Sequence, residues 1–84
     1  MSKLFLEVQL PSIAKTYEFS ADSAMTVGRL KAQIISQITA VENDTVFPAP
    51  ASVLFCSLEL GGLLQDQEVL SQVGVRSGDR IMLL

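Results

Sequence analysis

Histidine and tryptophan are absent from this chain of 84 residues, and it contains a single cysteine. Without histidine, the chain lacks the commonest general base, the usual activating partner of a Ser or Cys nucleophile, and the commonest metal ligand. One cysteine cannot form an intrachain disulfide, which favours a reducing compartment. We therefore expect a cytoplasmic protein that is not an enzyme and that carries no metal and no cofactor.

Charged residues are scarce as well, at 18% of the chain, and basic ones are the fewest, with 6 Lys and Arg against 9 Asp and Glu. Proteins that bind nucleic acid or an anionic membrane surface need a basic stripe to neutralise phosphates, and scattered cations on an acidic chain do not supply one. The apolar run from Leu4 to Leu10 is interrupted by Glu7 and Gln9, which is unlike a signal peptide or a membrane span. We expect neither nucleic-acid binding nor direct membrane insertion.

What the chain does contain is apolar residues, which make up 49% of it and give a mean hydropathy of +0.41. This composition excludes global disorder, which is typical of chains with low hydrophobicity and high net charge. A chain of this length can bury only one core. Residues 1–84 are therefore predicted to form a single domain.

Two stretches near the N-terminus alternate between apolar and polar residues, which is typical of half-buried strands. In residues 3–10, one predicted face carries Leu4, Leu6, Val8 and Leu10, and the other carries Phe5, Glu7 and Gln9. Residues 15–19 alternate again, after an interruption at Pro11. These two strands are predicted to form a hairpin.

The period then changes to that of a helix. After Thr26 the apolar residues are spaced by three or four positions, which places one apolar stripe along a helix; its members are Val27, Leu30, Ile34, Ile38 and Val41. Thr26 is the expected N-cap, because its hydroxyl can accept a hydrogen bond from a first-turn amide. Gly28 lowers helix stability, and close packing against a strand would explain it.

The second half is predicted to be mostly sheet. Residues 42–52 include Pro48 and Pro50 and are expected to form the main loop. A strand over 53–58 precedes a turn at Gly61-Gly62, and a short strand at 63–64, a helical turn at 69–73 and a last strand over 80–84 follow. One helix with four or five strands predicts an α+β domain in which the helix covers one face of the sheet.

The order and spacing of several motifs resemble those of ubiquitin-like β-grasp proteins. Thr26-Val27 with Leu30-Lys31-Ala32-Gln33-Ile34 resembles their helix. The pattern Gly61-Gly62-x-Leu64-x-Asp66, followed by Leu70-Ser71 and then Gly74-Val75-x-x-Gly78-Asp79-x-Ile81-x-Leu83, resembles the latter half of that fold. The resemblance implies one main helix on a four- to five-stranded mixed sheet, with the first and last strands parallel and adjacent.

Conjugated modifiers and sulfur carriers of this superfamily use a flexible tail that ends in Gly-Gly. Here the sequence ends at Leu84, directly after the last predicted strand, and Gly61-Gly62 is internal. We therefore expect a protein that is not conjugated, and a sulfur carrier or modifier remains the least favoured alternative.

Within the superfamily, the chain resembles the small YukD/EsaB-like proteins of bacterial type VII (WXG100) secretion. The similar segments are Lys3 to Pro11, Tyr17-Glu-Phe19, Met25-Thr-Val-Gly28 and Gly74 to Leu83. The resemblance implies an accessory or regulatory interaction module whose protein partners include membrane or ATPase components of the secretion system. The alternative is a ubiquitin-fold small subunit or adaptor of another cytoplasmic complex.

The candidate protein-binding residues lie on the predicted open face of the sheet. Strand alternation directs Phe5, Met82 and Leu84 away from the helix, and Phe55 is a further candidate member. Isolated exposed apolar residues are common, whereas a contiguous cluster indicates a binding surface or a homodimer contact. Cys56 lies in an apolar strand and is expected to be a small core residue.

Overall fold

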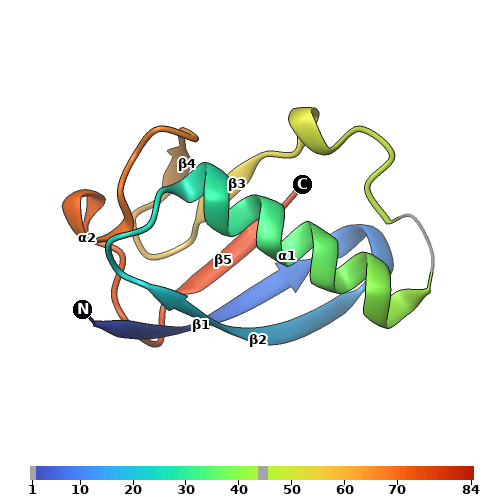
Figure 1. Cartoon of the computed structure of the whole chain (residues 1–84), viewed down its shortest axis with the longest axis horizontal. Helices are drawn as coiled ribbons and strands as arrows, with labels where there is room; N and C mark the ends of the chain where they lie inside the picture. The colour runs from blue at the N-terminus through green and yellow to red at the C-terminus, as the bar shows by residue number, and fades with distance from the viewer. Residues whose placement is uncertain (1, 44–45) are drawn as a thin grey trace.

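The computed structural model describes residues 2–43 and 46–84, which form two layers, a sheet and a helix across one of its faces (Figure 1). The strands are β1 (Lys3–Leu10), β2 (Lys15–Asp22), β3 (Phe55–Ser57), β4 (Gly62–Leu64) and β5 (Arg80–Leu83). The helices are α1 (Val27–Glu42) and the short α2 (Leu70–Val73), with 3-10 turns at Pro11–Ile13 and Pro50–Ser52. The predicted α+β arrangement, with one main helix on a mixed sheet, is confirmed.

The five strands follow the order β2-β1-β5-β3-β4, so that β2 and β4 are the edges of the sheet. The β1–β2 hairpin pairs eight residues on each strand, and β2 continues three residues beyond the predicted 15–19. Strand β5 lies parallel to β1, with Val8 opposite Ile81, as the resemblance implied. Strand β5 thus lies in the middle of the sheet, between β1 and β3, and helix α1 packs over this central part.

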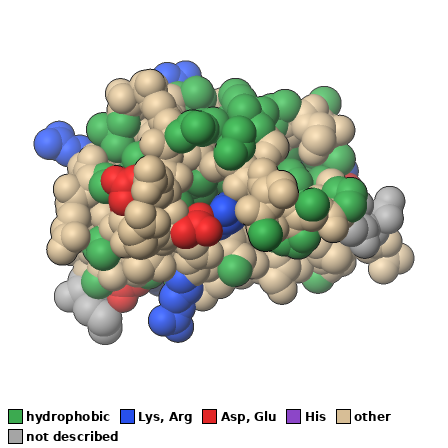
Figure 2. Space-filling view, turned by 90° about the horizontal axis from the view of Figure 1, so that it is seen from above, with side chains coloured by type: hydrophobic (Ala, Val, Ile, Leu, Met, Phe, Trp, Pro, Cys, Tyr) green, Lys and Arg blue, Asp and Glu red, His purple; other side chains and the backbone are tan. Residues whose placement is uncertain are grey.

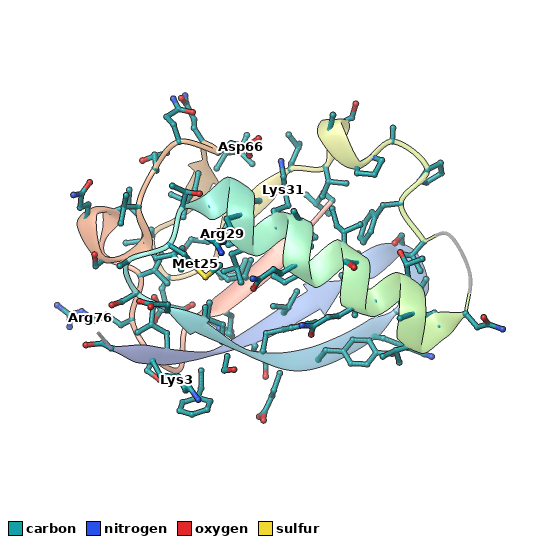
Figure 3. The ribbon with its side chains drawn as sticks, in the orientation of Figure 1. Lys3, Met25, Arg29, Lys31, Asp66 and Arg76 are labelled. Atoms are coloured by element: carbon teal, nitrogen blue, oxygen red, sulfur yellow. The ribbon has the colours of Figure 1, made fainter. Side chains whose placement is uncertain are left out.

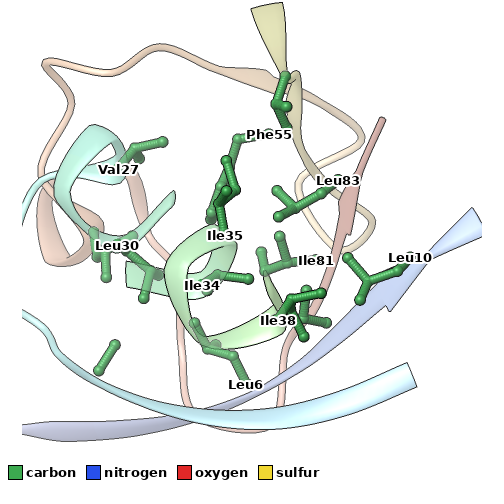
Figure 4. Packing of buried hydrophobic residues seen from close by; sticks show 14 of the residues in the cluster. Leu6, Leu10, Val27, Leu30, Ile34, Ile35, Ile38, Phe55, Ile81 and Leu83 are labelled. Atoms are coloured by element: carbon green, nitrogen blue, oxygen red, sulfur yellow. The ribbon is translucent and has the colours of Figure 1, made fainter. Parts of the chain in front are cut away.

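Helix α1 begins after Thr26, whose hydroxyl oxygen accepts a hydrogen bond from the Arg29 amide at 3.3 Å, as predicted. Its apolar side packs against the inner face of the sheet (Figure 4), and the buried apolar residues of the helix are Val27, Leu30, Ile34, Ile35 and Ile38. Val41 was expected in this stripe but is 66% exposed. The last helical turn lies at the margin of the sheet, where Lys15 and Tyr17 of the outer strand β2 contact Glu42.

Gly28 is explained by a close approach of another segment to the first turn of α1. Its amide donates to the carbonyl oxygen of Asp66 at 2.9 Å, and the Val27 amide donates to Glu68 at 2.8 Å. A Cβ atom at Gly28 would lie 2.9 Å from the Cβ of Asp66, too close for two carbon atoms. The glycine therefore allows contact with the turn that precedes α2, and not with a strand as we expected.

The loop predicted over 42–52 begins after Glu42, the last residue of α1, and residues 44 and 45 lie outside the described part of the chain. The described segment from residue 46 to β3 contains both prolines and buries Phe47 and Val53. The strand that follows is shorter than the predicted 53–58, because regular pairing is confined to Phe55–Ser57.

Residues 45–58 carry no charge. Seen from above, red and blue side chains lie mainly in the left and central parts of the surface, and most of the right part is apolar or uncharged (Figure 2). Within the described residues, no helix has the length and hydrophobicity needed to cross a membrane.

Candidate protein-binding site

The face of the sheet opposite α1 was predicted to carry Phe5, Met82 and Leu84. Phe5 is 61% exposed and Leu84 is 53% exposed, whereas Met82 is half-buried. Their neighbours in the chain, Leu4, Ile81 and Leu83, are buried beneath α1. The predicted alternation of β1 and β5 is therefore correct.

Phe55 does not belong to this face, and its assignment as a candidate binding residue is wrong. It is only 2% exposed, lies opposite Leu83 in the β3–β5 pairing, and points into the core (Figure 4). Residues 53–56 are all apolar, so alternation cannot determine the orientation of this strand. The pairing with β5 determines it instead.

Phe5 lies apart from Met82 and Leu84. In the parallel β1–β5 pairing Met82 is opposite Gln9, four residues along β1 from Phe5. Phe5 is held near the start of β5, where its amide donates to Ser77 Oγ at 2.9 Å and its carbonyl oxygen accepts from the Gly78 amide at 2.6 Å. The polar residues Glu7 and Arg80 lie between Phe5 and Met82 on the open face. The predicted cluster is therefore divided.

A contiguous apolar surface does form over β5, β3 and β4. Cys56 of β3 lies opposite Met82 on one side and opposite Leu63 of β4 on the other. Leu54 and Leu84 continue the β3–β5 ladder through two reciprocal backbone hydrogen bonds of 3.0 and 3.1 Å. We call this surface the open-face patch; its members are Leu54, Cys56, Leu63, Met82 and Leu84.

The exposure of the patch residues distinguishes them from the core. Leu54 is 47% exposed and Leu63 is 59% exposed, while Cys56 is half-buried. The expectation that Cys56 is a core residue is wrong, because Phe55 takes the inward position and leaves Cys56 on the opposite face. Side chains from three strands thus form one apolar surface. It includes Cys56, which we had expected in the core.

An ion pair borders the patch. Arg80 precedes Met82 by two residues on the same face, and its Nε lies 2.8 Å from Glu59 Oε2. The Arg80 backbone amide also donates to Glu59 Oε1 at 2.6 Å. These bonds, first that from the backbone amide, hold the pKa of Glu59 below its ordinary value, and the carboxylate raises the pKa of Arg80. An apolar centre with a charged border is typical of protein-binding surfaces.

Sequence reasoning missed Leu54 and Leu63 as members of the site. Strand β4 has only three residues, too few for a readable alternation, and Leu54 precedes the regular part of β3. To assign Leu54 to the site, one would need the register of β3 with β5, because that register places Leu54 beside Leu84. Among residues 2–43 and 46–84, no three Cys, Asp or Glu side chains gather in a group that could hold a metal ion.

Solved structures resemble this chain over nearly its whole length. The N-terminal ubiquitin-like domain of the 4931431F19Rik protein matches with a TM-score of 0.76 and 22% identity, over 98% of this chain and 73% of that one. The ubiquitin-like domain of the Arabidopsis thaliana protein At2g32350 gives 0.71 and 22%, over 100% and 78%. Caldiarchaeum subterraneum ubiquitin gives 0.69 and 21%, over 98% and 91%.

No family model matches the chain, and no curated protein matches it. At these identities the solved structures establish the architecture alone. The strand order, the parallel β1–β5 pair and the single long helix agree with that architecture. The protein has the ubiquitin-like fold.

Proposed function

We propose that the protein is a non-enzymatic interaction module that binds a partner protein in the cytoplasm through the open-face patch. The observation that carries this proposal is the continuity of five apolar side chains across three strands, three of them about half exposed or more. Contiguous exposed apolar surfaces in small domains mark binding sites more often than scattered ones do. A ubiquitin-like fold is compatible with such a module.

The size of the patch indicates a contact of moderate strength. Covering apolar surface contributes about 25 cal/mol per Å², so burial of Leu54, Leu63 and Leu84 contributes several kcal/mol before the costs of association. This favours a reversible contact, with a partner or with a second copy, over a permanent complex. Because the patch itself is uncharged, its binding should change little with salt.

We further propose that the partner belongs to a bacterial type VII secretion system and that this protein is an accessory or regulatory component. The support is the resemblance of its first and last strands and its helix start to YukD/EsaB-like proteins. The proposal includes no conjugation step. Gly61 lies in the turn into β4 with a φ of 74°, and Gly62 is the first residue of that strand, so we assign this glycine pair a structural role.

Affinity purification from the native cell after crosslinking tests both levels of the proposal. The wild-type protein should recover the secretion ATPase or its membrane partners. A Leu54→Ser/Leu63→Ser variant should lose them, while Phe5→Ser, which removes an equally exposed side chain outside the patch, should retain them.

Two results would contradict the proposal in different ways. If the wild type recovers a different complex and the patch variant loses it, the open-face patch remains the binding site. The secretion role would then be replaced by that of a subunit or adaptor of the other complex. Equal recovery by the wild type and the patch variant would remove the patch from the function.

A further inference from the structure

The outer edge of β2 offers unpaired backbone groups over the middle of a long strand. Strand β2 is the edge of the sheet beside β1, and its outer side is uncovered (Figure 1). The Ser23 amide donates to the Ser2 carbonyl at 2.8 Å, which fixes the residues that bond to β1. The N–H and C=O groups of Thr16, Glu18 and Ser20 therefore point outward. Outside the β1–β2 ladder, no backbone bond between described residues uses them.

Edge strands are usually protected by proline, by a bulge or by charged side chains. The eight β1–β2 pairs are continuous and contain no bulge, and residues 15–22 contain no proline. The charge at the centre of this edge is Glu18. The charges around Glu18 decide between two roles: protection of the edge against pairing, or recognition of a partner strand.

Glu18 ends a row of charges that crosses the open face and is not balanced. It lies directly opposite Glu7 on β1, and Glu7 lies opposite Arg80 on β5. Arg80 is already paired with Glu59 at 2.8 Å. Glu7 and Glu59 thus both lie beside the one guanidinium group of Arg80, and Gln9 Nε2 donates to Glu7 Oε2 at 3.3 Å. Glu18 has no cation of this kind, and among the described residues no ion pair includes it. Like charges directly opposite each other in a sheet are destabilising. A cation on a strand added beside β2 would balance the row.

The other side of the same edge suits apolar side chains. Tyr17 and Phe19 are half-buried on the α1 side of β2, with ring centroids 6.5 Å apart. A hollow of about 580 Å³ opens beyond them, between the end of β2 and α1, and its lining includes Ala21, Met25 and Arg29. Met25 and Arg29 are labelled in Figure 3. A strand laid along β2 would direct alternate side chains toward these groups.

A second copy of this chain fits the edge poorly. Antiparallel pairing of β2 with β2 of another copy, in the registers centred on the strand, places the two Glu18 side chains opposite or diagonal to each other. Both positions bring like charges within reach, at a site that already holds Glu7. The charge of this edge therefore favours a different chain with a basic residue at that place.

We propose that the β2 edge binds an extended segment of a partner protein as a sixth strand, antiparallel to β2, with a basic side chain opposite Glu18 and apolar side chains on the α1 side. The backbone groups of Thr16, Glu18 and Ser20 provide the hydrogen bonds, and Glu18 selects the partner. This site is separate from the open-face patch, which lies over β3, β4 and β5.

The test uses a synthetic peptide, acetyl-Val-Thr-Val-Lys-Val-Thr-Val-amide, whose sequence reads the same in both directions. In the antiparallel pairing, methyl groups on the nitrogens of the two valines beside the lysine block the outer edge of the bound peptide, and so the growth of a larger sheet, without touching the bonds to β2. In an NMR titration of the full chain, the amides of Thr16, Glu18 and Ser20 should shift and become protected from exchange.

The charge requirement is tested with a matched peptide that has glutamate in place of lysine. The wild type should bind the lysine peptide about two- to fivefold more tightly, and E18K should reverse this preference. The control Gln67→Lys changes net charge at an exposed turn and should leave the preference as it is. Methylation of the central lysine nitrogen should abolish binding, because that N–H bonds to β2.

Several results would overturn the proposal. These are an absence of shifts at the three amides, a preference that E18K does not change, or shifts confined to the open-face patch. Concentration-dependent protection of the same amides without peptide would assign the edge to a second copy instead. The Leu54→Ser/Leu63→Ser variant should bind the peptide normally, so failure at one site is distinguished from failure at the other.

Discussion

Lys31 and Asp66 form an ion pair of 2.8 Å that joins the buried side of α1 to the turn before α2 (Figure 3). Lys31 is only 8% exposed, although it is a lysine, and its Nζ also donates to the Val53 carbonyl at 3.0 Å. The Asp66 side chain is 62% exposed. The lysine thus connects three segments, and most of its value should come from the bond to Val53, which is shielded from water.

Replacing Lys31 by Met keeps the length of the side chain but removes the donor to the Val53 carbonyl. We expect a loss of about 1–3 kcal/mol in the free energy of unfolding, which is typical of an unsatisfied buried acceptor. Asp66→Asn should cost about 1 kcal/mol or less, because the Asp66 side chain is 62% exposed, where water screens its charge, and because Lys31 keeps its bond to the Val53 carbonyl. Urea denaturation measures both changes, with Lys3→Met as an exposed control. Equal losses for Lys31→Met and Asp66→Asn would mean that the ion pair, and not the bond to Val53, stabilises the fold.

Gly28→Ala should destabilise the protein although alanine is the better helix former. Alanine raises helix propensity by up to about 1 kcal/mol. The added Cβ would lie 2.9 Å from Asp66 Cβ and 3.2 Å from the Asp66 carbonyl oxygen, and such overpacking costs about 1–3 kcal/mol. The matched control is Gly62→Ala, because no atom lies within 4 Å of a Cβ there. A rise in melting temperature for Gly28→Ala would show that the turn before α2 moves away freely.

Leu30→Ala and Ile34→Ala should each cost about 2–5 kcal/mol, because each leaves a cavity between α1 and the sheet. Leu30 is 1% exposed and Ile34 is fully buried. In a domain of this size such a loss approaches the whole stability. Val41→Ala is the control on the same helix, and its loss should be small because Val41 is 66% exposed. Chemical denaturation would contradict this prediction if both core variants lost less than 1 kcal/mol.

The fold was predictable where the sequence carries a clear period. In strand β1, Glu7 and Gln9 mark the outer face, and α1 has both an apolar stripe and a capping Thr26, so their faces were predicted correctly. Where every residue is apolar, as around Phe55 and Cys56, period gives no orientation, and the pairing with β5 decided it.

The binding site was predicted only in part for the same reason. Met82 and Leu84 follow from the alternation of β5, but Leu63 reaches the patch through a pairing between short strands that local sequence does not encode. Gly28 is a similar case, because a glycine is required there by the close approach of Asp66, which lies 38 residues further along the chain. Contacts between distant segments are therefore what the sequence pattern could not supply.

A cluster at the other end of α1 should make stability depend on pH. The Tyr17 hydroxyl donates to Glu42 Oε2, and Lys15 Nζ lies 2.9 Å from Glu42 Oε1. The bond from Tyr17, followed by that from Lys15, holds the pKa of Glu42 below its ordinary 4.5. Glu42 raises the pKa of Tyr17 above 10.0 and that of Lys15 above 10.5.

The sign of the effect follows from these directions. A carboxyl group with a lowered pKa stabilises the folded state fully above its unfolded pKa, and this stability is lost as the pH falls through the folded value. We therefore expect the wild type to lose stability on acidification below about pH 4.5, and Glu42→Gln and Tyr17→Phe to lose less over the same interval. On the alkaline side, the contributions of Tyr17 and Lys15 are present below pH 10 and are lost as the pH rises through their raised values. Thermal unfolding from pH 2 to 11 measures the loss of stability on both the acid and the alkaline side. If both variants lose as much stability on acidification as the wild type does, the cluster contributes nothing to folding.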